Sequence, residues 1–162
     1  MAIDYEKLKN WPFEPVEQTY TANDSILYAL GLGVGAAPLD DSDLRFTFEE
    51  ADEFAALPFM AVVLGTPGFW VRDPASGIAW QKVLHGEQGV EWHGPVPAAG
   101  TVVAQNRVAE IIDKGADKGA LLYIEREITD KATGARIATT TSTTFARADG
   151  GFGGPTLSLI HI

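Results

Sequence analysis

The sequence predicts an α+β fold in which helical segments pack against one face of a largely antiparallel sheet. Two observations favour this class. One strand pattern and two helical patterns occupy the N-terminal half, whereas residues from about 78 to 145 read as successive strands. The chain has 162 residues, of which 46% are apolar. It therefore fits one domain, or one half of a duplicated pair, and can bury a core without disulfides or metals.

The first strand and the first helix are predicted from alternation and capping chemistry. Polarity alternates from Val16 to Thr21, which predicts a strand. Asn23-Asp24-Ser25 supplies N-cap chemistry for a helix that contains Ile26 to Leu30. We expect this helix to end at the glycines that follow it, Gly31, Gly33 and Gly35.

A second helical segment is predicted after a polar, acidic loop over residues 36–46. Thr47-Phe-Glu-Glu50 fits a capping box, which predicts a helix start at this point. Pro58 interrupts the helical pattern. The apolar run Phe59 to Leu64 could continue as helix or strand, and periodicity alone does not decide between them.

The C-terminal half predicts an antiparallel meander. Val90 and Trp92 alternate with polar neighbours in its first strand. In the next two strands, one face is predicted to carry the following apolar residues: Val102, Ala104, Val108 and Ile112, then Leu122, Ile124 and Ile128. Asp130 to Gly134 has the chemistry of a hairpin loop, and the threonine-rich stretch Ile137 to Phe145 suits a last strand. The cluster Gly150 to Gly154 is expected to end the ordered part.

Composition excludes several classes of function. With 12 basic and 22 acidic residues the net charge is −10, which argues against nucleic-acid binding, because that needs a cationic surplus. No cysteine is present, so disulfides and thiolate chemistry are excluded. The N-terminal residues lack a signal-peptide pattern, and the longest apolar run is too short to cross a membrane. We expect a soluble, cytoplasmic protein with no membrane partner.

Two short patterns resemble cofactor or metal motifs, but both have a simpler interpretation. Gly31 to Ala36 can be aligned with the dinucleotide fingerprint, yet a helix precedes these glycines and Pro38 follows them, so a helix end is the better interpretation. His85 and Glu87 would share a strand face, with His93 further along. Without a third ligand at a suitable spacing, we predict no metal site and no cofactor.

A glycine and a lysine are more informative. Gly86 follows His85 inside a predicted strand, where a glycine usually marks a bulge or the close approach of a ligand. Lys114 follows a strand end, beside a turn, and in isolation it would be interpreted as a solvated surface residue.

Several motifs together resemble one known family. They are Tyr20 to Gly31, Leu84-His-Gly-Glu-Gln88, Pro95-Val-Pro97, Asp113-Lys-Gly115 and Gly150-Gly-Phe-Gly-Gly154. They occur in the order shown by the N-terminal half of the R-specific 2-enoyl-CoA hydratases, also called hydratase 2 or MaoC-like dehydratases, which include the hydratase part of the peroxisomal multifunctional enzyme. The resemblance runs from about Trp11 to Gly154.

This resemblance implies a hotdog fold, a curved antiparallel sheet wrapped against a helix. Members of the family contain two such domains in tandem and add water to a trans-2-enoyl-CoA, which gives a (3R)-hydroxyacyl-CoA without a metal or redox cofactor. An Asp and a His in a motif Asp-x-Asn-Pro-x-His of the second domain carry the proton transfers. In this chain Asp24 stands in the place of that Asp, but Ala29 stands in the place of the His. The resemblance thus implies no catalytic residue here, and a helix-capping role for Asp24.

The same resemblance implies a substrate-holding role. The family's contacts to the acyl-CoA map onto His85, Gly86 and Lys114. A lysine can bind a CoA phosphate as a point charge, and a glycine lets the ligand approach the backbone closely. Loose candidates for the lining of an acyl tunnel are Leu57, Phe59, Met60 and Val63, although an ordinary core position is the better interpretation for each of them.

We expect residues 1–154 to form the hotdog domain and residues 155–162 to be a tail before a missing catalytic hotdog. The expected partners are an acyl-CoA ester and a second hotdog domain or a second copy of this chain. Two alternatives to the non-catalytic half remain open at this point. One is a stand-alone hotdog thioesterase that uses Asp24 or Glu87 as its acid, and the other is a non-enzymatic subunit that pairs with a separate catalytic hotdog.

Overall fold

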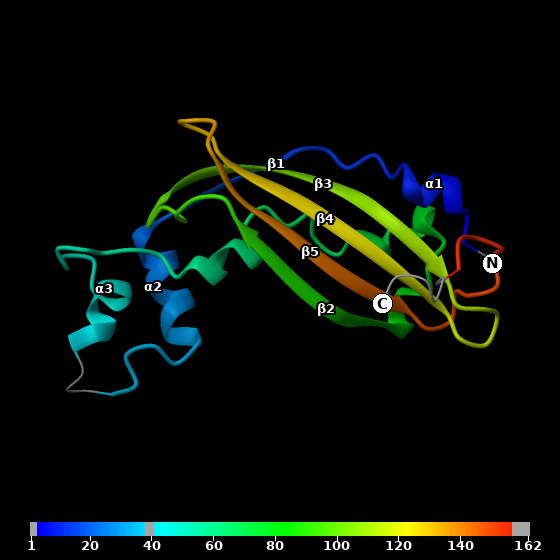
Figure 1. Ribbon diagram of the computed structural model, residues 1–162, viewed down its shortest axis with the longest axis horizontal. Helices are drawn as coiled ribbons and strands as arrows, with labels where there is room; N and C mark the ends of the chain where they lie inside the picture. Colours follow the sequence, from blue (N-terminus) through cyan, green and yellow to red (C-terminus); the bar gives the residue numbers. More distant parts are fainter. Residues whose placement is uncertain (1–2, 38–40, 157–162) are drawn as a thin grey trace.

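A curved five-stranded antiparallel sheet forms the centre of the computed structural model, which describes residues 3–37 and 41–156 (Figure 1). The strand order is β1-β3-β4-β5-β2, so β1 and β2 form the two edges. The strands are β1 (Val16–Tyr20), β2 (Val83–Trp92), β3 (Gly100–Asp113), β4 (Ala120–Asp130) and β5 (Arg136–Ala146). The predicted α+β class is confirmed. Residues 157–162, most of the predicted tail, lie outside the described residues.

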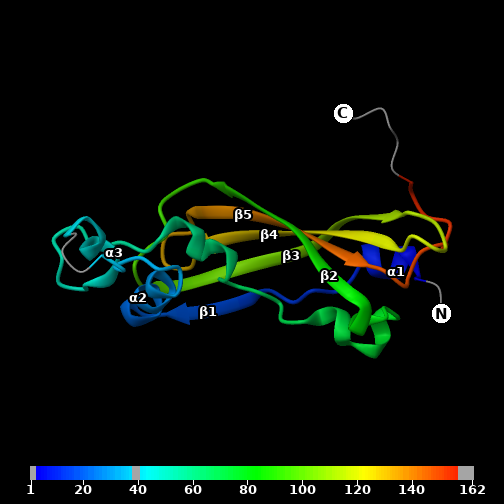
Figure 2. The same ribbon diagram turned by 90° about the horizontal axis from the view of Figure 1, so that it is seen from below.

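The α-helices lie at the two ends of this sheet (Figures 1 and 2). They are α1 (Tyr5–Lys9), α2 (Ala22–Gly31) and α3 (Leu44–Thr47), and short 3₁₀ helices connect α3 to β2, the longest being η2 (Pro58–Val62). The α2 and α3 helices lie together at one end, and α1 lies at the other. None of the helices in the described part of the chain has the length and apolarity needed to cross a membrane.

The position of α2 follows from its caps. Thr21 is the N-cap, and a capping box joins it to Asp24, the third residue of the helix. The predicted cap at Asn23-Asp24-Ser25 was therefore two residues late, because Thr21 has the extended backbone that an N-cap needs. The helix ends at Gly31 as predicted, and Gly33 has a φ of +87°, a conformation that favours glycine.

The predicted helix start at Thr47 is wrong. Thr47 is the last residue of α3, and its hydroxyl donates to the Asp43 carbonyl instead of capping a new helix. Phe48 is extended and ends the helix. The apolar run after Pro58 is neither α-helix nor strand, because it folds mainly as the 3₁₀ helix η2.

Two apolar clusters form the core, one toward each end of the sheet. The first joins Met60 and Leu64 to β3, β4 and β5, and partly buried Tyr28 of α2 packs against it. The second joins α1 and the segments before β2 to the other half of the sheet. A bulge in β3 between Val108 and Glu110 shifts the alternation. Ile111, which is 0% exposed, therefore continues the buried face in place of the predicted Ile112.

The α1 helix had no predicted counterpart. It packs beside β3 beyond the short strand β1, where the backbone of β3 lacks a neighbouring strand. Lys9 Nζ donates to the Val108 and Ala109 carbonyls at the bulge. Tyr5 donates to Glu110, at 2.9 Å. In this way α1 covers an edge that would otherwise be open to pairing.

Candidate functional site

Gly86 lies at a β-bulge on the edge strand β2, as its position in the sequence predicted. The register with β5 shifts between His85, which pairs with Thr144, and Glu87, which pairs with Thr143. A Cβ on Gly86 would lie 3.2 Å from the Thr143 carbonyl oxygen. This contact is tight, so a side chain at position 86 would require β2 and β5 to shift slightly, and glycine fits the bulge without such a shift.

His85 lines a cavity of about 240 Å³. The register places it in line with Thr144 and with the buried Leu122, so it belongs to the face of the sheet that carries the core. The walls of this cavity combine aromatic and hydroxyl side chains, namely Phe69, Trp70, Thr140, Ser142 and Thr144. Such a lining suits a ligand that is largely apolar with a few polar atoms.

Arg126 is a buried cation in the same cavity, and the sequence analysis missed it. Its side chain is 9% exposed, and burial lowers the pKa of its guanidinium. It donates to the carbonyls of Leu64 at 2.6 Å and Val62 at 3.1 Å, and to the Thr140 hydroxyl. The guanidinium thus holds the segment at the end of η2 against the sheet. Alternation in β4 places Arg126 on the same face as Leu122, Ile124 and Ile128, and this was the signal that could have revealed a buried cation.

Lys114 lies on the other face of the sheet from His85. Its Nζ is 4.9 Å from the centre of the Phe145 ring, within range of a cation–π contact. Phe145 pairs with Leu84, the residue before His85, and neighbouring strand residues point to opposite faces. The structure therefore does not bring Lys114 and His85 into one cavity. Lys114 instead lines an open hollow of about 600 Å³ together with Asp113, Gly115, Lys118, Gly153, Gly154 and Thr156.

Asp113 joins the two glycine-containing loops at this hollow. One of its carboxylate oxygens accepts from the Gly115 amide at 2.8 Å and the Gly151 amide at 2.7 Å, and the other accepts from the Gly153 amide at 2.8 Å. These bonds, that from Gly151 first, lower the pKa of the Asp113 carboxyl. The carboxylate is only 6% exposed. The hydrogen-bond acceptors of this carboxylate are therefore occupied by backbone amides and not by a cationic side chain.

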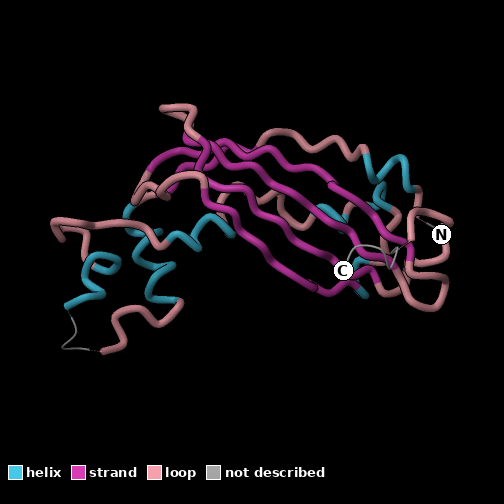
Figure 3. The backbone as a smooth tube through the Cα atoms, viewed as in Figure 1, coloured by secondary structure: helices cyan, strands magenta, loops and turns pink. Residues whose placement is uncertain are grey.

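The loops packed around Asp113 explain one of the glycines in the terminal cluster. A Cβ on Gly150 would lie 2.1 Å from the Gly115 carbonyl oxygen and 2.6 Å from that of Gly119. Only a residue without a side chain fits this contact. These loops gather at the end of the sheet opposite α2 (Figure 3).

Asp24 is occupied in the capping box at the start of α2. Its carboxylate accepts from the Thr21 amide at 2.7 Å and from the Thr21 hydroxyl at 2.8 Å. The backbone bond, followed by the hydroxyl bond, lowers the pKa of the Asp24 carboxyl. Five residues further along the helix, Ala29 is 0% exposed and offers no proton-transfer group.

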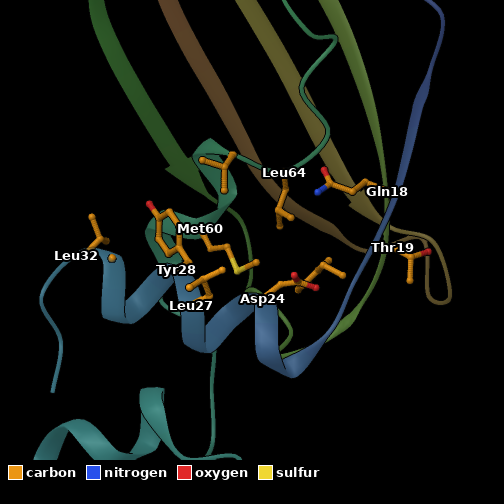
Figure 4. Close-up of a pocket in the computed structure, with 11 residues that line it drawn as sticks. Gln18, Thr19, Asp24, Leu27, Tyr28, Leu32, Met60 and Leu64 are labelled. Atoms are coloured by element: carbon orange, nitrogen blue, oxygen red, sulfur yellow. The ribbon is translucent and has the colours of Figure 1, made fainter.

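A groove of about 540 Å³ lies between α2, β1 and the segment Met60–Leu64 (Figure 4). Two of the four predicted acyl-tunnel residues, Met60 and Val63, line it, and Asp24 lies at its wall. The other two do not line it. Phe59 packs edge-on against Trp92, with ring centres 5.1 Å apart, and Leu57 is the residue that precedes η2.

Glu87 on β2 and His93, the residue that follows β2, each have a hydroxyl partner on β5. Glu87 accepts from the Thr143 hydroxyl, and a ring nitrogen of His93 lies 2.8 Å from the Thr139 hydroxyl. Within residues 3–37 and 41–156, no three His, Asp or Glu side chains are grouped so that they could hold a metal ion. The glycines from Gly31 to Gly35 follow α2 and do not open a helix that could hold a pyrophosphate.

Comparison with known proteins is consistent with this geometry. The family model described as the MFE-2 hydratase 2 N-terminal domain matches residues 18–148. The probable enoyl-CoA hydratase 2 of Dictyostelium discoideum is 35% identical over 160 residues, which is 95% of this chain and 51% of that protein. The chain thus spans about half the length of this relative.

Solved structures agree in fold. The crystal structure of a MaoC-like dehydratase from Phytophthora capsici superposes with a TM-score of 0.69 at 30% identity, over 95% of this chain and 52% of that one. Full-length peroxisomal multifunctional enzyme type 2 from Drosophila melanogaster gives a TM-score of 0.64 at 32% identity, over 91% of this chain and 26% of that one. The predicted hotdog fold is confirmed.

Proposed function

The chain belongs to the family of the MFE-2 hydratase 2 N-terminal domain, and we propose that it is the acyl-CoA-binding, non-catalytic half of an R-specific enoyl-CoA hydratase. The complete reaction would convert a trans-2-enoyl-CoA into a (3R)-hydroxyacyl-CoA. In this proposal a second hotdog domain supplies the proton transfers, and this chain holds the thioester.

Two residues of α2, Asp24 and Ala29, support the proposal that this chain is not catalytic. A general base works best when its pKa is near the working pH and its lone pairs can reach the substrate. The Asp24 carboxylate has a lowered pKa and accepts two hydrogen bonds from Thr21. Ala29 stands in the position where the family's catalytic half has its histidine. Asp24 therefore acts as a helix cap, and Ala29 offers no imidazole that could form a proton-transfer pair with it.

The binding part rests on the bulged edge strand. His85 lines a cavity with an aromatic wall, and Gly86 forms the β-bulge beside it. We assign the thioester end of the ligand to this position. Lys114 lies across the sheet, near Phe145. A CoA thioester is an extended molecule, and in this proposal a single ligand contacts both residues.

The groove beside α2 is the best candidate for the acyl chain. Met60, Leu64 and Leu27 give it apolar walls, and the groove is open at the surface. Burial of each methylene of a chain in such a place stabilises binding by about 0.8 kcal/mol. Affinity should therefore rise with chain length until the groove is filled.

A partner hotdog would cover apolar surface that the described part of the chain leaves exposed. Leu84 and Trp92 on the edge strand β2 are exposed, as are Leu27 and Leu30 on α2. An edge strand with exposed apolar side chains is a site of pairing with another chain. We assign this edge to a catalytic hotdog or, in its absence, to a second copy of this chain.

The proposal is tested by titrating the purified chain with trans-2-decenoyl-CoA in a calorimeter and by assaying the same sample for (3R)-hydroxydecanoyl-CoA. We expect binding without product. His85→Ala should weaken binding about tenfold, as expected when one polar contact to a ligand is lost. His93→Ala, just beyond the far end of β2, is the matched control and should bind like the wild type.

Two results would count against this function. Product formed by the chain alone would remove the non-catalytic assignment. Absence of any heat of binding for enoyl-CoA esters of several lengths would remove the acyl-CoA assignment.

A further inference from the structure

Two lysines, not one, line the hollow at the glycine-loop end of the sheet. Lys114 and Lys118 belong to the loop between β3 and β4, and both line the hollow of about 600 Å³. Lys118 is exposed. Among the described residues, no salt bridge neutralises either of them, since the ion pairs there involve Arg107, Lys131 and Arg136. Two unneutralised ammonium groups at one hollow favour an anion.

Two of the glycines that line this hollow, Gly115 and Gly153, do not have the role that glycines have in phosphate-binding loops. In such loops backbone amides point at the phosphate. Here the amides of Gly115 and Gly153, and that of Gly151, donate to the Asp113 carboxylate. The lysine side chains are therefore the groups that we assign to an anion in the hollow, and these glycine amides hold the loops together.

Asp113 fixes the loop that carries both lysines. Its own amide donates to the Pro155 carbonyl at 2.7 Å, and its carboxylate joins the β3–β4 loop to the glycine cluster. The Lys114 amide donates to Gly119 and the Lys118 amide donates to Gly115, so the loop closes on itself. The conformation of the β3–β4 loop thus depends on Asp113, because its carboxylate accepts hydrogen bonds from the backbone amides of both loops.

We propose that Lys114 and Lys118 together bind a phosphate group of the CoA nucleotide, and that Asp113 is the positioning residue that holds the two lysines at the hollow. This inference rests on the proposed function, because it assumes that the ligand is a CoA thioester. It adds a second cation and a positioning residue to the site. It also predicts that the domain distinguishes a nucleotide-bearing thioester from the same thioester without its nucleotide.

Because the overall charge of the chain is negative, an anionic nucleotide needs a local cation such as the Lys114–Lys118 pair. A net charge of −10 repels a polyanion such as CoA at long range. Ammonium groups contribute as point charges that are screened by salt, so the contribution of the pair should fall as ionic strength rises. Lys114 is further restrained by the Phe145 ring at 4.9 Å.

The test compares three ligands by calorimetry, namely decanoyl-CoA, decanoyl-dephospho-CoA and S-decanoyl-pantetheine. We expect Lys118→Ala to weaken decanoyl-CoA binding about tenfold, which is the loss of one charge-assisted contact. Binding of S-decanoyl-pantetheine should not change. If the pair binds the 3′-phosphate, the effect disappears with decanoyl-dephospho-CoA; if it binds the diphosphate, the effect persists with that ligand.

Matched controls separate a phosphate site from a general effect. Lys131→Ala removes an exposed lysine at the opposite end of the sheet, where it pairs with Glu17, and should leave all three affinities unchanged. Asp113→Asn should weaken decanoyl-CoA binding while S-decanoyl-pantetheine binds normally, whereas a merely destabilised fold would weaken both. If Asp113→Asn does not fold, the effect of Lys118→Ala on the binding of decanoyl-CoA and S-decanoyl-pantetheine still tests the two-lysine site.

The outcomes are distinguishable from failure of the proposed function. Wild-type chain that binds decanoyl-CoA with the same affinity as Lys118→Ala overturns the two-lysine site and leaves the proposed function intact. If Lys118→Ala loses equal affinity for decanoyl-CoA and for S-decanoyl-pantetheine, the two-lysine site is overturned as well. Wild-type chain that binds no acyl-CoA overturns both proposals together.

Discussion

The two ends of the sheet use a carboxylate in the same way but leave different groups available. At the α2 end, Asp24 accepts from the backbone and hydroxyl of Thr21. At the glycine-loop end, Asp113 accepts from three glycine amides. Both carboxyl groups have a lowered pKa because of these bonds. What differs is what surrounds them, since Ala29 adds no polar group to α2, whereas Lys114 and Lys118 line the hollow beside Asp113.

This difference shows that an acidic residue within a motif indicates a chemical role only when the groups near it are known. A carboxylate whose lone pairs are filled by its own backbone organises a loop or a helix start. Chemistry on a ligand then depends on neighbouring side chains that still have free donors. At the α2 end the Thr21 hydroxyl donates to Asp24 and the Ser25 hydroxyl donates to the Ala98 carbonyl, whereas the loop end presents the ammonium groups of Lys114 and Lys118. The comparison can be tested at each end separately.

The largest effect is expected for a methyl group added between the packed loops. Gly150→Ala should lower the free energy of unfolding by about 3 kcal/mol, because its Cβ would overlap the Gly115 and Gly119 carbonyl oxygens. Gly31→Ala at the end of α2 is the matched variant, with no atom within 4 Å of its Cβ. It should be neutral or stabilise the helix by up to about 1 kcal/mol. Urea unfolding of both variants measures the difference.

Equal stability of the two glycine variants would contradict this account of the loop end. It would mean that the loops can separate without loss, and then Asp113 could not hold the lysines in place.

A smaller and pH-dependent effect is expected for Asp113→Asn. At neutral pH the amide should lower the free energy of unfolding by about 2 kcal/mol, because its Nδ2 would face a glycine amide that needs an acceptor. The folded-state pKa of Asp113 is lower than its unfolded-state value. Its contribution is therefore fully present above the unfolded pKa, about 3.9, and is lost as pH falls through the folded pKa.

Thermal unfolding of wild type and Asp113→Asn between neutral pH and about pH 2 measures this contribution. The two stability curves should converge on the acid side. Curves that remain parallel throughout would show that the Asp113 charge does not stabilise the loops.

The smallest effect is expected at the α2 end. Thr21→Ala removes the N-cap and should lower the free energy of unfolding by about 1 kcal/mol. Since Asp24 has no proposed contact with the CoA nucleotide, the affinity ratio between decanoyl-CoA and S-decanoyl-pantetheine should stay as in the wild type. A changed ratio, measured by calorimetry, would mean that the two ends of the sheet are coupled.

Local patterns predicted elements whose signal lies in consecutive residues. Alternation predicted β1 and β4, the threonine-rich run predicted β5, and Asp130 to Gly134 forms the predicted hairpin loop. The capping box was recognised at Thr47, but the true one begins at Thr21. Both sites have a hydroxyl three residues before an acid, and only the backbone conformation of Thr21 is extended. A motif of this kind does not report backbone geometry, so sequence alone could not choose.

Features that depend on contacts between distant segments were missed. The bulge in β3 inverts the face of Ile111 and Ile112, because two residues there lie opposite one on β4. Lys9 bonds the backbone of β3 at this bulge, about a hundred residues further along the chain. Arg126 lies on the apolar face of β4, and its partners are the carbonyls of Val62, the last residue of η2, and of Leu64 beyond it, more than sixty residues away in the chain.

The sequence by itself determined the fold class, the family and the residues at which a ligand is expected, because strand periodicity, glycine positions and short motifs are local properties of the chain. Only the tertiary structure decided that His85 and Lys114 lie on opposite faces of the sheet, that Asp113 faces three glycine amides, and that Lys118 shares a hollow with Lys114. The physical reason is that the side on which a strand residue lies, and the partner that a loop meets, depend on register and packing between segments far apart in the chain.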